Sequence, residues 1–404
     1  MALAKGAPES GAAADPVAPQ AVAFWRDERK RGILAQAVVI ALLAGFFWFL
    51  LGNFLIKQEL SGAPPLSLYF LQDVAGFQLS FSLIPLTLDS PIGRLIAAGA
   101  LNTLLAAFFA GIIATFLGLI VGIARLSKNW LISRIAATYI EIIRNIPLLL
   151  QLVFWYGGVL TALPKPKDSI SILEMVFLNI KGLFLPMPIF QEGVGWFFMS
   201  IAVCIGLAIA IARWARNRQM ATGQQFPTVM VNTAVIILLP SFVFVMLHDP
   251  IGWEYPIKGA FNFKGGLTVQ PEMTALIIGI GISTAAYVAE IVRAGINSVS
   301  HGQSEAAHAL GLKSSWTLRL VVLPQALRVI IPPMISQYLN VVKNSTLAGF
   351  IGYADLFAVI GTSQNQTGRA VECVIILMVF YLTISLIIST VMNVYNKRAA
   401  LVER

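Results

Sequence analysis

The sequence predicts an all-α polytopic membrane protein with about eight transmembrane helices, because several of its apolar runs reach the ~20 residues that cross a bilayer. Hydrophobic residues make up 57% of the chain and charged residues only 12%, about half of the roughly 25% that is usual in soluble domains. Lys and Arg concentrate in alternate segments between the apolar runs, about two to one in favour of one side. This positive-inside bias predicts that both termini are cytoplasmic.

The apolar runs divide the chain into successive parts. The first residues are rich in Ala, Pro and Gly, which is typical of a disordered tail. Further along, we interpret two spans between outside loops as an inserted helical hairpin and not as a soluble domain. The expected spans are 33–56, 95–123, 132–160, 196–211, 229–247, 273–296, 324–347 and 373–394. The expected parts are a cytoplasmic disordered tail (1–32), the first span with a periplasmic segment (33–91), a first core part (92–162), inserted loops with the two-span hairpin (163–270), a second core part (271–396) and a cytoplasmic tail (397–404).

Glycines and prolines predict how some of these spans pack and bend. Gly118 and Gly122 have the small-residue spacing that favours close packing of helices in lipid. Pro147 is expected to kink or end its helix, because proline lacks a backbone donor. By the same reasoning, Pro332 and Pro333 are expected to break the span 324–347 into two pieces.

The sequence lacks the residues that several other functions need. It contains no Gly-Lys dipeptide and therefore no Walker A phosphate-binding loop. His248, His301 and His308 are scattered without metal-ligand spacing, and Cys204 and Cys373 fall inside apolar runs, as small buried hydrophobic residues do. We therefore predict no catalytic residue, no metal and no cofactor. The net charge of +9 follows from the inside residues and does not require a nucleic acid partner.

A polar island separates the sixth and seventh expected spans. Its first part is rich in helix formers, and Ser300 and Gln303 have the spacing of a capping box that would start a helix. Gly311 lies where a helix commonly ends in the left-handed conformation. Ser314 is expected to cap a second short helix. The predicted result is a bent helix pair that stands off the membrane, a shape suited to docking into a cleft of a partner.

The same island carries a specific motif. From residue 305 it reads EAAHALGLKSSWTLRLVVLP. This resembles the cytoplasmic EAA loop of ABC-importer permeases, whose pattern is EAA-x3-G-x9-I-x-LP, with Val321 in place of Ile. The resemblance implies that the loop is the coupling helix, which docks on a separate ATP-hydrolysing subunit. The matching residues are Glu305, Ala306, Ala307, Gly311, Leu323 and Pro324.

Other segments resemble one group within these permeases. YIEIIRNIPLLLQL (139–152) and AYVAEIVRAGI (286–296) are similar to signatures of the polar amino acid (His/Glu/Gln/Arg) subfamily, although Asn145 and Ile146 replace the usual Gly-Thr. The long N-terminal region with FWRDERKRG and the inserted hairpin resemble the Q-type permease subunit of the general L-amino acid ABC transporters.

The resemblance implies a type I ABC importer permease core that forms the path for L-amino acids. It implies an ABC ATPase, a second permease subunit in a heterodimer and a periplasmic amino acid-binding protein as partners, in a bacterial inner membrane. The chain itself would not be an enzyme, because the partner hydrolyses ATP. The residues alone also admit a secondary amino acid transporter driven by an ion gradient, or a membrane sensor that transports nothing. A requirement for an ATPase separates the first class from the other two.

The candidate substrate residues lie in the span before the polar island. Ser283, Tyr287 and Glu290 share one helix face, and Thr284 is adjacent. A carboxylate inside a span is costly unless it faces a cavity or a partner, so Glu290 is a candidate to bind a substrate ammonium group. The alternative is a structural pair between Glu290 and Arg293 at the inner membrane edge.

Two further pairs are weaker candidates. Asn102 and Thr103 are candidates for the substrate path, but such residues often bind neighbouring helices instead. Glu141 and Arg144 lie three residues apart, so they are expected to share a helix face and to line the path or form a structural pair.

Overall fold

The computed structural model describes residues 28–60, 66–259 and 262–399. The chain forms two units, Met1–Ser67 and Leu68–Arg404. In the first unit, α1 (Glu28–Leu60) contains the stretch Arg31–Ile56, which is long and apolar enough to cross a membrane. The predicted disordered tail falls mostly on residues 1–27, which lie outside the described residues.

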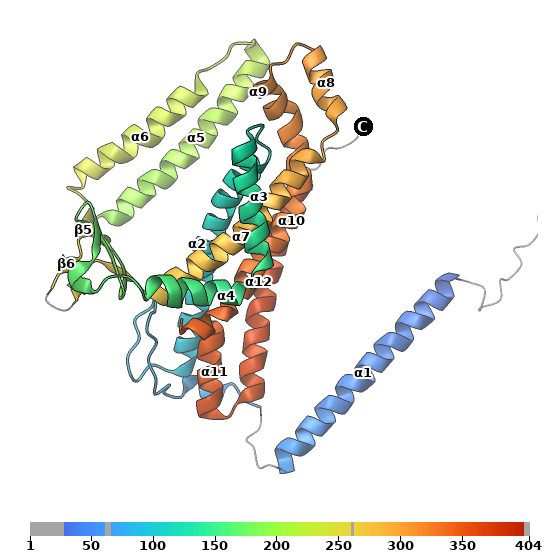
Figure 1. The fold of residues 1–404 in the computed structure, drawn as a ribbon, viewed down its shortest axis with the longest axis vertical. Helices are drawn as coiled ribbons and strands as arrows, with labels where there is room; N and C mark the ends of the chain where they lie inside the picture. Colours follow the sequence, from blue (N-terminus) through green and yellow to red (C-terminus); the bar gives the residue numbers. More distant parts are fainter. Residues whose placement is uncertain (1–27, 61–65, 260–261, 400–404) are drawn as a thin grey trace, which may run out of the picture. The chain divides into compact units, whose positions relative to one another are not determined.

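The second unit is built mainly from helices (Figure 1). They are α2 (Ile92–Arg125), α3 (Trp130–Asn145), α4 (Leu148–Val153), α5 (Val194–Thr222), α6 (Thr228–Met246), α7 (Pro271–Asn297), α8 (His301–Ala309), α9 (Ser314–Thr317), α10 (Leu323–Asn344), α11 (Leu356–Thr367) and α12 (Ala370–Ala399). The helical segments of other types are η2 (Tyr69–Gln72), η4 (Pro166–Asp168) and η6 (Ser345–Ile351), which are 3-10 helices, and η3 (Phe154–Leu160) and η5 (Leu318–Val322), which are π-helices. Within the described residues, 7 helices can span a membrane by length and composition, or up to 8 if a bent pair is one span. The predicted fold class is confirmed.

The tightest packing in this unit joins α2 to α7. A methyl group at Gly118 would lie 2.5 Å from a side-chain carbon of Val288, and one at Gly122 would lie 2.8 Å from the carbonyl oxygen of Ala289. Both distances are too short for a carbon, so only glycine lets the two helices approach this closely. The packing predicted from the glycine spacing is confirmed.

The third predicted span is sharply bent. The chain turns by 104° between α3 and the α4–η3 segment, with Pro147 at the break, as predicted. The side chain of Gln151 is buried and donates to the carbonyl oxygens of Ile143 and Ile146, at 2.9 and 2.8 Å. These bonds satisfy carbonyls that the interrupted helix leaves without a partner, which stabilises the bend.

The predicted break at Pro332 and Pro333 is wrong. Both prolines lie inside α10, which continues from Leu323 to Asn344. Ile330, Ile331 and Met334 beside them are buried. This packing holds the helix together where proline removes two backbone donors, as membrane helices permit when neighbouring groups support them.

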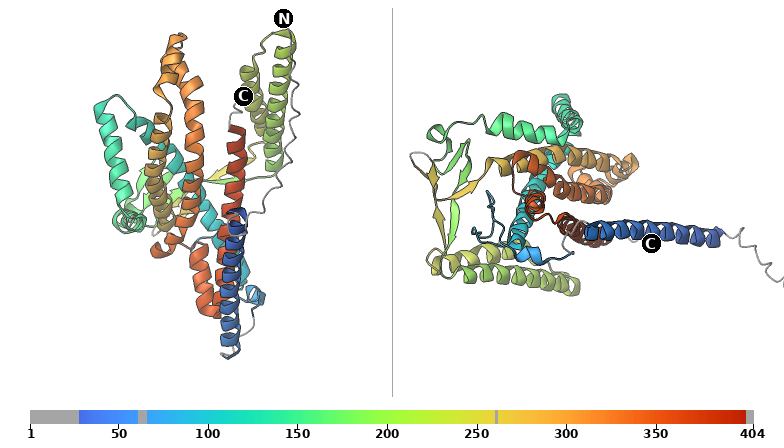
Figure 2. Two further views of the ribbon diagram at one scale, coloured as in Figure 1. Left: turned by 90° about the vertical axis from the view of Figure 1, so that its right-hand side faces the viewer. Right: turned by 90° about the horizontal axis from the view of Figure 1, so that it is seen from below.

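The inserted region contains the expected hairpin, α5 and α6, and also short strands that sequence reasoning assigned to loops. The strands are β1 (Ile170–Ile172), β2 (Val176–Asn179), β3 (Gly182–Leu185), β4 (Met187–Phe190), β5 (Ile251–Glu254), β6 (Ile257–Lys258), β7 (Phe263–Lys264) and β8 (Leu267–Val269). They form antiparallel sheets in the orders β1-β2-β3-β8, β4-β5 and β6-β7. Figure 2 shows them gathered at one end of the hairpin. Each strand is too short to show a local pattern, and two of the pairings, β3 with β8 and β4 with β5, join residues on either side of the hairpin, so the strands were not predictable from local sequence.

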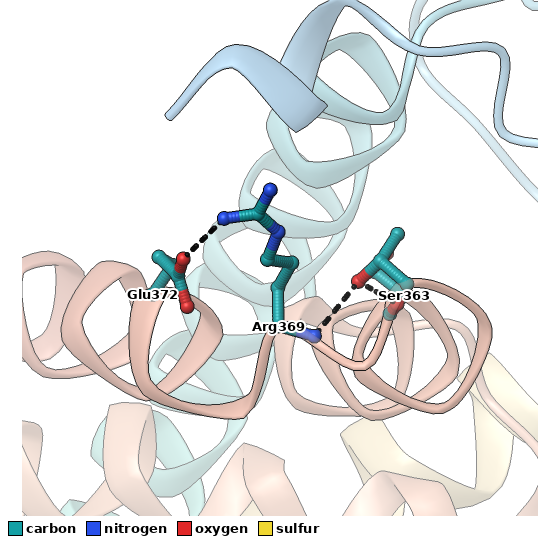
Figure 3. Close-up of polar contacts among 4 residues, drawn as sticks. Ser363, Arg369 and Glu372 are labelled. Carbon is teal, nitrogen blue, oxygen red and sulfur yellow. Dashed lines mark hydrogen bonds and ion pairs between the residues drawn. The ribbon is translucent and has the colours of Figure 1, made fainter. Parts of the chain in front are cut away.

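A short helix, α11, precedes the last span and was also not predicted. The corner between α11 and α12 is held by a nearly buried ion pair, in which Arg369 Nη1 lies 2.9 Å from Glu372 Oε1 (Figure 3). The backbone N–H of Arg369 donates to Thr367 Oγ1 at 3.3 Å, and Thr367 Oγ1 donates to the carbonyl of Ser363. These bonds close the C-terminus of α11 and fix the direction in which α12 begins.

Candidate functional site

The polar island forms the bent helix pair that its sequence predicts. Gly311 has a φ of +78°, in the left-handed region. Its N–H donates to the carbonyl of His308 at 2.9 Å, and the N–H of Leu312 donates to the carbonyl of Ala307 at 3.1 Å. This bond pattern is the Schellman motif, which ends α8 and redirects the chain. The predicted role of Gly311 in the turn is confirmed.

The predicted side-chain caps of the two helices are wrong. Ser300 precedes α8 as its N-cap residue, but its side chain makes no capping bond. The side-chain oxygen of Gln303 instead accepts a bond from Gln325 of α10, at 3.4 Å. At α9 the N-cap residue is Lys313, whose carbonyl accepts bonds from the backbone of Trp316 and Thr317, and Ser314 is already helical.

The loop presents a mixed polar and apolar surface. Ala307 is buried and anchors α8, whereas Glu305 and Ala306 are exposed. Leu310 at the tip is 83% exposed. Leu323 and Pro324 open α10 and are also exposed. The exposed part of the loop therefore combines a charged side chain with apolar ones.

A polar cavity of about 530 Å³ lies where the bend after α3 meets α7 and α10. Ser283, Thr284 and Tyr287 line it, which brings together three of the predicted substrate residues. Its other polar lining residues are Arg144, Asn145, Gln337, Asn340 and Asn344. In a chain this apolar, such a concentration of hydrogen-bonding groups is a candidate binding site for a polar solute.

Arg144 is the cation of this cavity. Its guanidinium carbon lies 5.3 Å from the centre of the Tyr287 ring, within the range of a cation–π contact. Glu141, its predicted partner, is exposed on α3, and the ion pairs of the described residues do not include the two together. The bend at Pro147 exposes Arg144 and Asn145 to the cavity, because the helix ends there.

Glu290 does not line the cavity. Both of its carboxylate oxygens bind Arg293, with Nε 3.0 Å from Oε2 and Nη2 close to Oε1. Each side chain of this pair is about one-third exposed. The structure therefore places Glu290 in the pair with Arg293, one turn beyond Tyr287 along α7.

Asn102 and Thr103 lie away from the cavity and are fully buried. Asn102 Nδ2 donates to the carbonyls of Phe81 and Ala354, both at 2.9 Å. Thr103 Oγ1 accepts from the N–H of Leu356 at 3.0 Å. The two side chains tie α2 to the segment before it and to the start of α11.

Sequence reasoning missed the contribution of α10 to the cavity. Gln337, Asn340 and Asn344 recur at intervals of three and four residues, so they share one face of this helix. That spacing was a readable signal, since amides repeated on one face of an apolar span require a cavity or a polar neighbour.

A family model and two relatives all name transport system components. A family model described as "Binding-protein-dependent transport system inner membrane component" matches residues 226–401. The chain is 46% identical to the general L-amino acid transport system permease protein AapQ of Rhizobium johnstonii, over 94% of each chain. It is 42% identical to the putative amino-acid ABC transporter permease protein YhdX of Escherichia coli, over 92% of this chain and 94% of that one.

A shorter relative matches only about half of this chain. The glutamate/aspartate import permease protein GltJ of Escherichia coli is 31% identical, over 94% of its own length but only 54% of this chain. None of these relatives supports the ion-gradient alternative, because each is named as a permease component of an import or transport system. With nearly half of its residues identical to AapQ along almost the whole chain, this protein belongs to the binding-protein-dependent ABC transporter permeases.

Proposed function

We propose that this chain imports L-amino acids as one of two permease subunits in a bacterial inner membrane. The observation that carries the proposal is the polar cavity, which one helix, α7, connects directly to the coupling loop. The names of the relatives support amino acids as the substrates. The chain termini lie in the cytoplasm in this proposal, since the basic flanks lie there.

The cavity has the groups that a zwitterion needs. The Arg144 guanidinium binds the substrate α-carboxylate, as arginine does wherever a planar carboxylate must be held. The amide oxygens of Asn340 and Asn344 accept bonds from the ammonium group. Amides and hydroxyls both donate and accept, so the rest of the lining tolerates different substrate side chains.

The coupling loop connects this cavity to the energy source. An ABC ATPase docks on the exposed surface formed by Glu305, Ala306 and Leu310, and the turn at Gly311 sets its shape. Motion of the ATPase then moves α7 and α10, which together line the cavity. A periplasmic amino acid-binding protein delivers the substrate, and the second permease subunit completes the path. Transport requires only that the cavity opens to opposite sides in the two states.

The test is uptake by the purified complex in proteoliposomes, with a panel of radiolabelled L-amino acids. We expect uptake that needs ATP and continues when ionophores collapse ion gradients. Arg144→Met should lower uptake of every amino acid at least tenfold, because the α-carboxylate is common to all. Arg134→Met is the matched control, since Arg134 is exposed on the same helix and does not line the cavity. Uptake that stops with ionophores and ignores ATP would overturn the proposal.

A further inference from the structure

A second polar cavity, of about 430 Å³, lies at the end of α7 opposite the coupling loop. Its wall is shared between the inserted region and the helical core. Lys181, Phe184 and Phe263 come from the insert, Glu272 and Gly352 come from the core, and Ser80 comes from the segment before α2. We call it the outer pocket. It exists only because the insert folds against the core.

The wall of the outer pocket is firmly built. Phe184 and Phe263 are 2% and 7% exposed, and their rings lie 4.6 Å apart between centroids. Strand β3, which carries Phe184, pairs with β8, which leads directly into α7. The side chain of Gln270, at that junction, donates to the carbonyl of Ser80. These contacts join insert and core, so the pocket is a fixed feature and not a gap between loose loops.

The outer pocket carries one residue of each charge. Lys181 lies in the turn between β2 and β3, where its N–H donates to Asn179 Oδ1 at 2.8 Å. Glu272 lies in the first turn of α7, and its Oε1 accepts a bond from the Tyr156 hydroxyl at 3.0 Å. A carboxylate has about four acceptor sites, so this one bond leaves Glu272 able to accept hydrogen bonds from other donors. A cation and an anion lining one small cavity match the carboxylate and ammonium groups of a zwitterion.

The outer pocket is aligned with the cavity around Arg144. Glu272 and Ser283 are both on α7, and their spacing puts them on nearly the same helix face, ~16 Å apart along the axis. Apolar side chains pack together between the two cavities. Leu152 and Leu276 are fully buried, and a methyl group at Gly279 would lie 2.6 Å from a Leu152 methyl carbon. Two polar cavities on one line are thus separated by a tightly packed apolar layer.

We propose that the outer pocket is a first binding site for zwitterionic amino acids, occupied before they pass to the cavity around Arg144. This inference rests on the proposed function. Lys181 binds the α-carboxylate and Glu272 binds the ammonium group. The inserted region then has a role in transport, because it supplies the cation and the aromatic wall.

The test uses a cysteine in the wall of the outer pocket. Thr268 lines it and is exposed, whereas both native cysteines are buried. In the whole complex without ATP, Thr268→Cys is labelled with a membrane-impermeant thiol reagent. L-Alanine should slow labelling at least fivefold, whereas propionate and isopropylamine, which each lack one charge, should not. When Lys181→Met or Glu272→Gln is added to Thr268→Cys, L-alanine should no longer slow labelling. Lys264→Met, on the same insert, is the control and should leave the effect of L-alanine unchanged.

Two outcomes separate this inference from the proposed function. If the complex transports L-alanine but L-alanine does not slow labelling of Thr268→Cys, the outer pocket is not a binding site and the proposed function stands. If the complex transports no amino acid under ATP, the proposed function itself fails. A charge swap, Lys181→Glu with Glu272→Lys, adds a readout that folding defects cannot imitate. It should restore the protection that each single change removes, since a zwitterion can bind in the reverse direction.

Discussion

Substitution of Gly311 tests whether coupling depends on a left-handed turn after α8. The φ of Gly311 is +78°, and apart from Gly311 and its two chain neighbours no atom of the described residues lies within 4 Å of the place where a Cβ would be. A side chain therefore has room, and the cost of a substitution comes from the backbone alone. The left-handed conformation costs an ordinary residue ~1–2 kcal/mol, and less for Asn or Asp, whose side chains bond locally.

That cost gives a ranked expectation. A penalty of ~1–2 kcal/mol lowers the population of the native turn roughly 5- to 30-fold. We expect Gly311→Val to impair docking of the ATPase most, Gly311→Ala less, and Gly311→Asn least. Gly311→Asp has the backbone tolerance of Asn, so any additional loss measures the effect of a negative charge on docking. Gly302→Ala is the matched control, because Gly302 also has open space around it but lies inside α8.

The assay is purification of the tagged permease in mild detergent, with the ratio of bound ATPase to permease measured for each variant. ATP-driven uptake is measured in parallel. The Gly302→Ala variant should retain the ATPase fully, since alanine favours a helix more than glycine does. Equal retention by the Val, Ala and Asn variants would refute the reasoning, because it would show that the backbone conformation at residue 311 does not matter.

Three further expectations concern stability, measured as the midpoint of thermal unfolding in detergent. Gly118→Ala should destabilise by ~1–3 kcal/mol, because its methyl group would overlap Val288, whereas Gly111→Ala on the same helix meets no atom and should not; equal midpoints would contradict the α2–α7 packing. Gln151→Leu should cost ~2–4 kcal/mol, since it leaves two carbonyls of the bend without a donor; an unchanged midpoint would show that the bend needs no such support. Burial raises the pKa of Asp355 to about 6, so the folded protein holds a proton that the unfolded chain releases near pH 4. Stability should therefore fall as pH rises from about 4 to about 6, by up to roughly 3 kcal/mol, and Asp355→Asn should remove this part of the pH dependence; an identical pH profile in that variant would count against the buried carboxyl.

The sequence predicted well wherever one residue or a local run decides the outcome. The spans follow from apolar length, and the fold class with them. The bend at Pro147 and the turn at Gly311 follow from backbone chemistry that belongs to those residues alone. The motif from Glu305 to Pro324 was specific enough to indicate the family, which the relatives confirm.

The candidate site was only half visible. Ser283, Thr284 and Tyr287 were found because they share a face of one helix, but that periodicity says nothing about which other helices meet it. Glu290 shares the same face, yet its carboxylate accepts hydrogen bonds from Arg293 and does not line the cavity. Helical periodicity predicts on which side of the helix a residue lies. It does not predict whether that residue faces a cavity or contacts a neighbouring side chain.

Only the tertiary structure decided the contacts between residues far apart in the chain. The strands of the insert form because β3 meets β8 across the α5–α6 hairpin, and no local pattern encodes that meeting. Pro332 and Pro333 remain helical because the packing around Ile330 and Met334 outweighs the two lost hydrogen bonds. Both cavities form where separate elements converge, so their charges and amides come together only in the fold. Hydropathy and backbone sterics act within a few residues, whereas pairing and packing depend on the whole chain, and this difference in range divides what the sequence determined from what the structure decided.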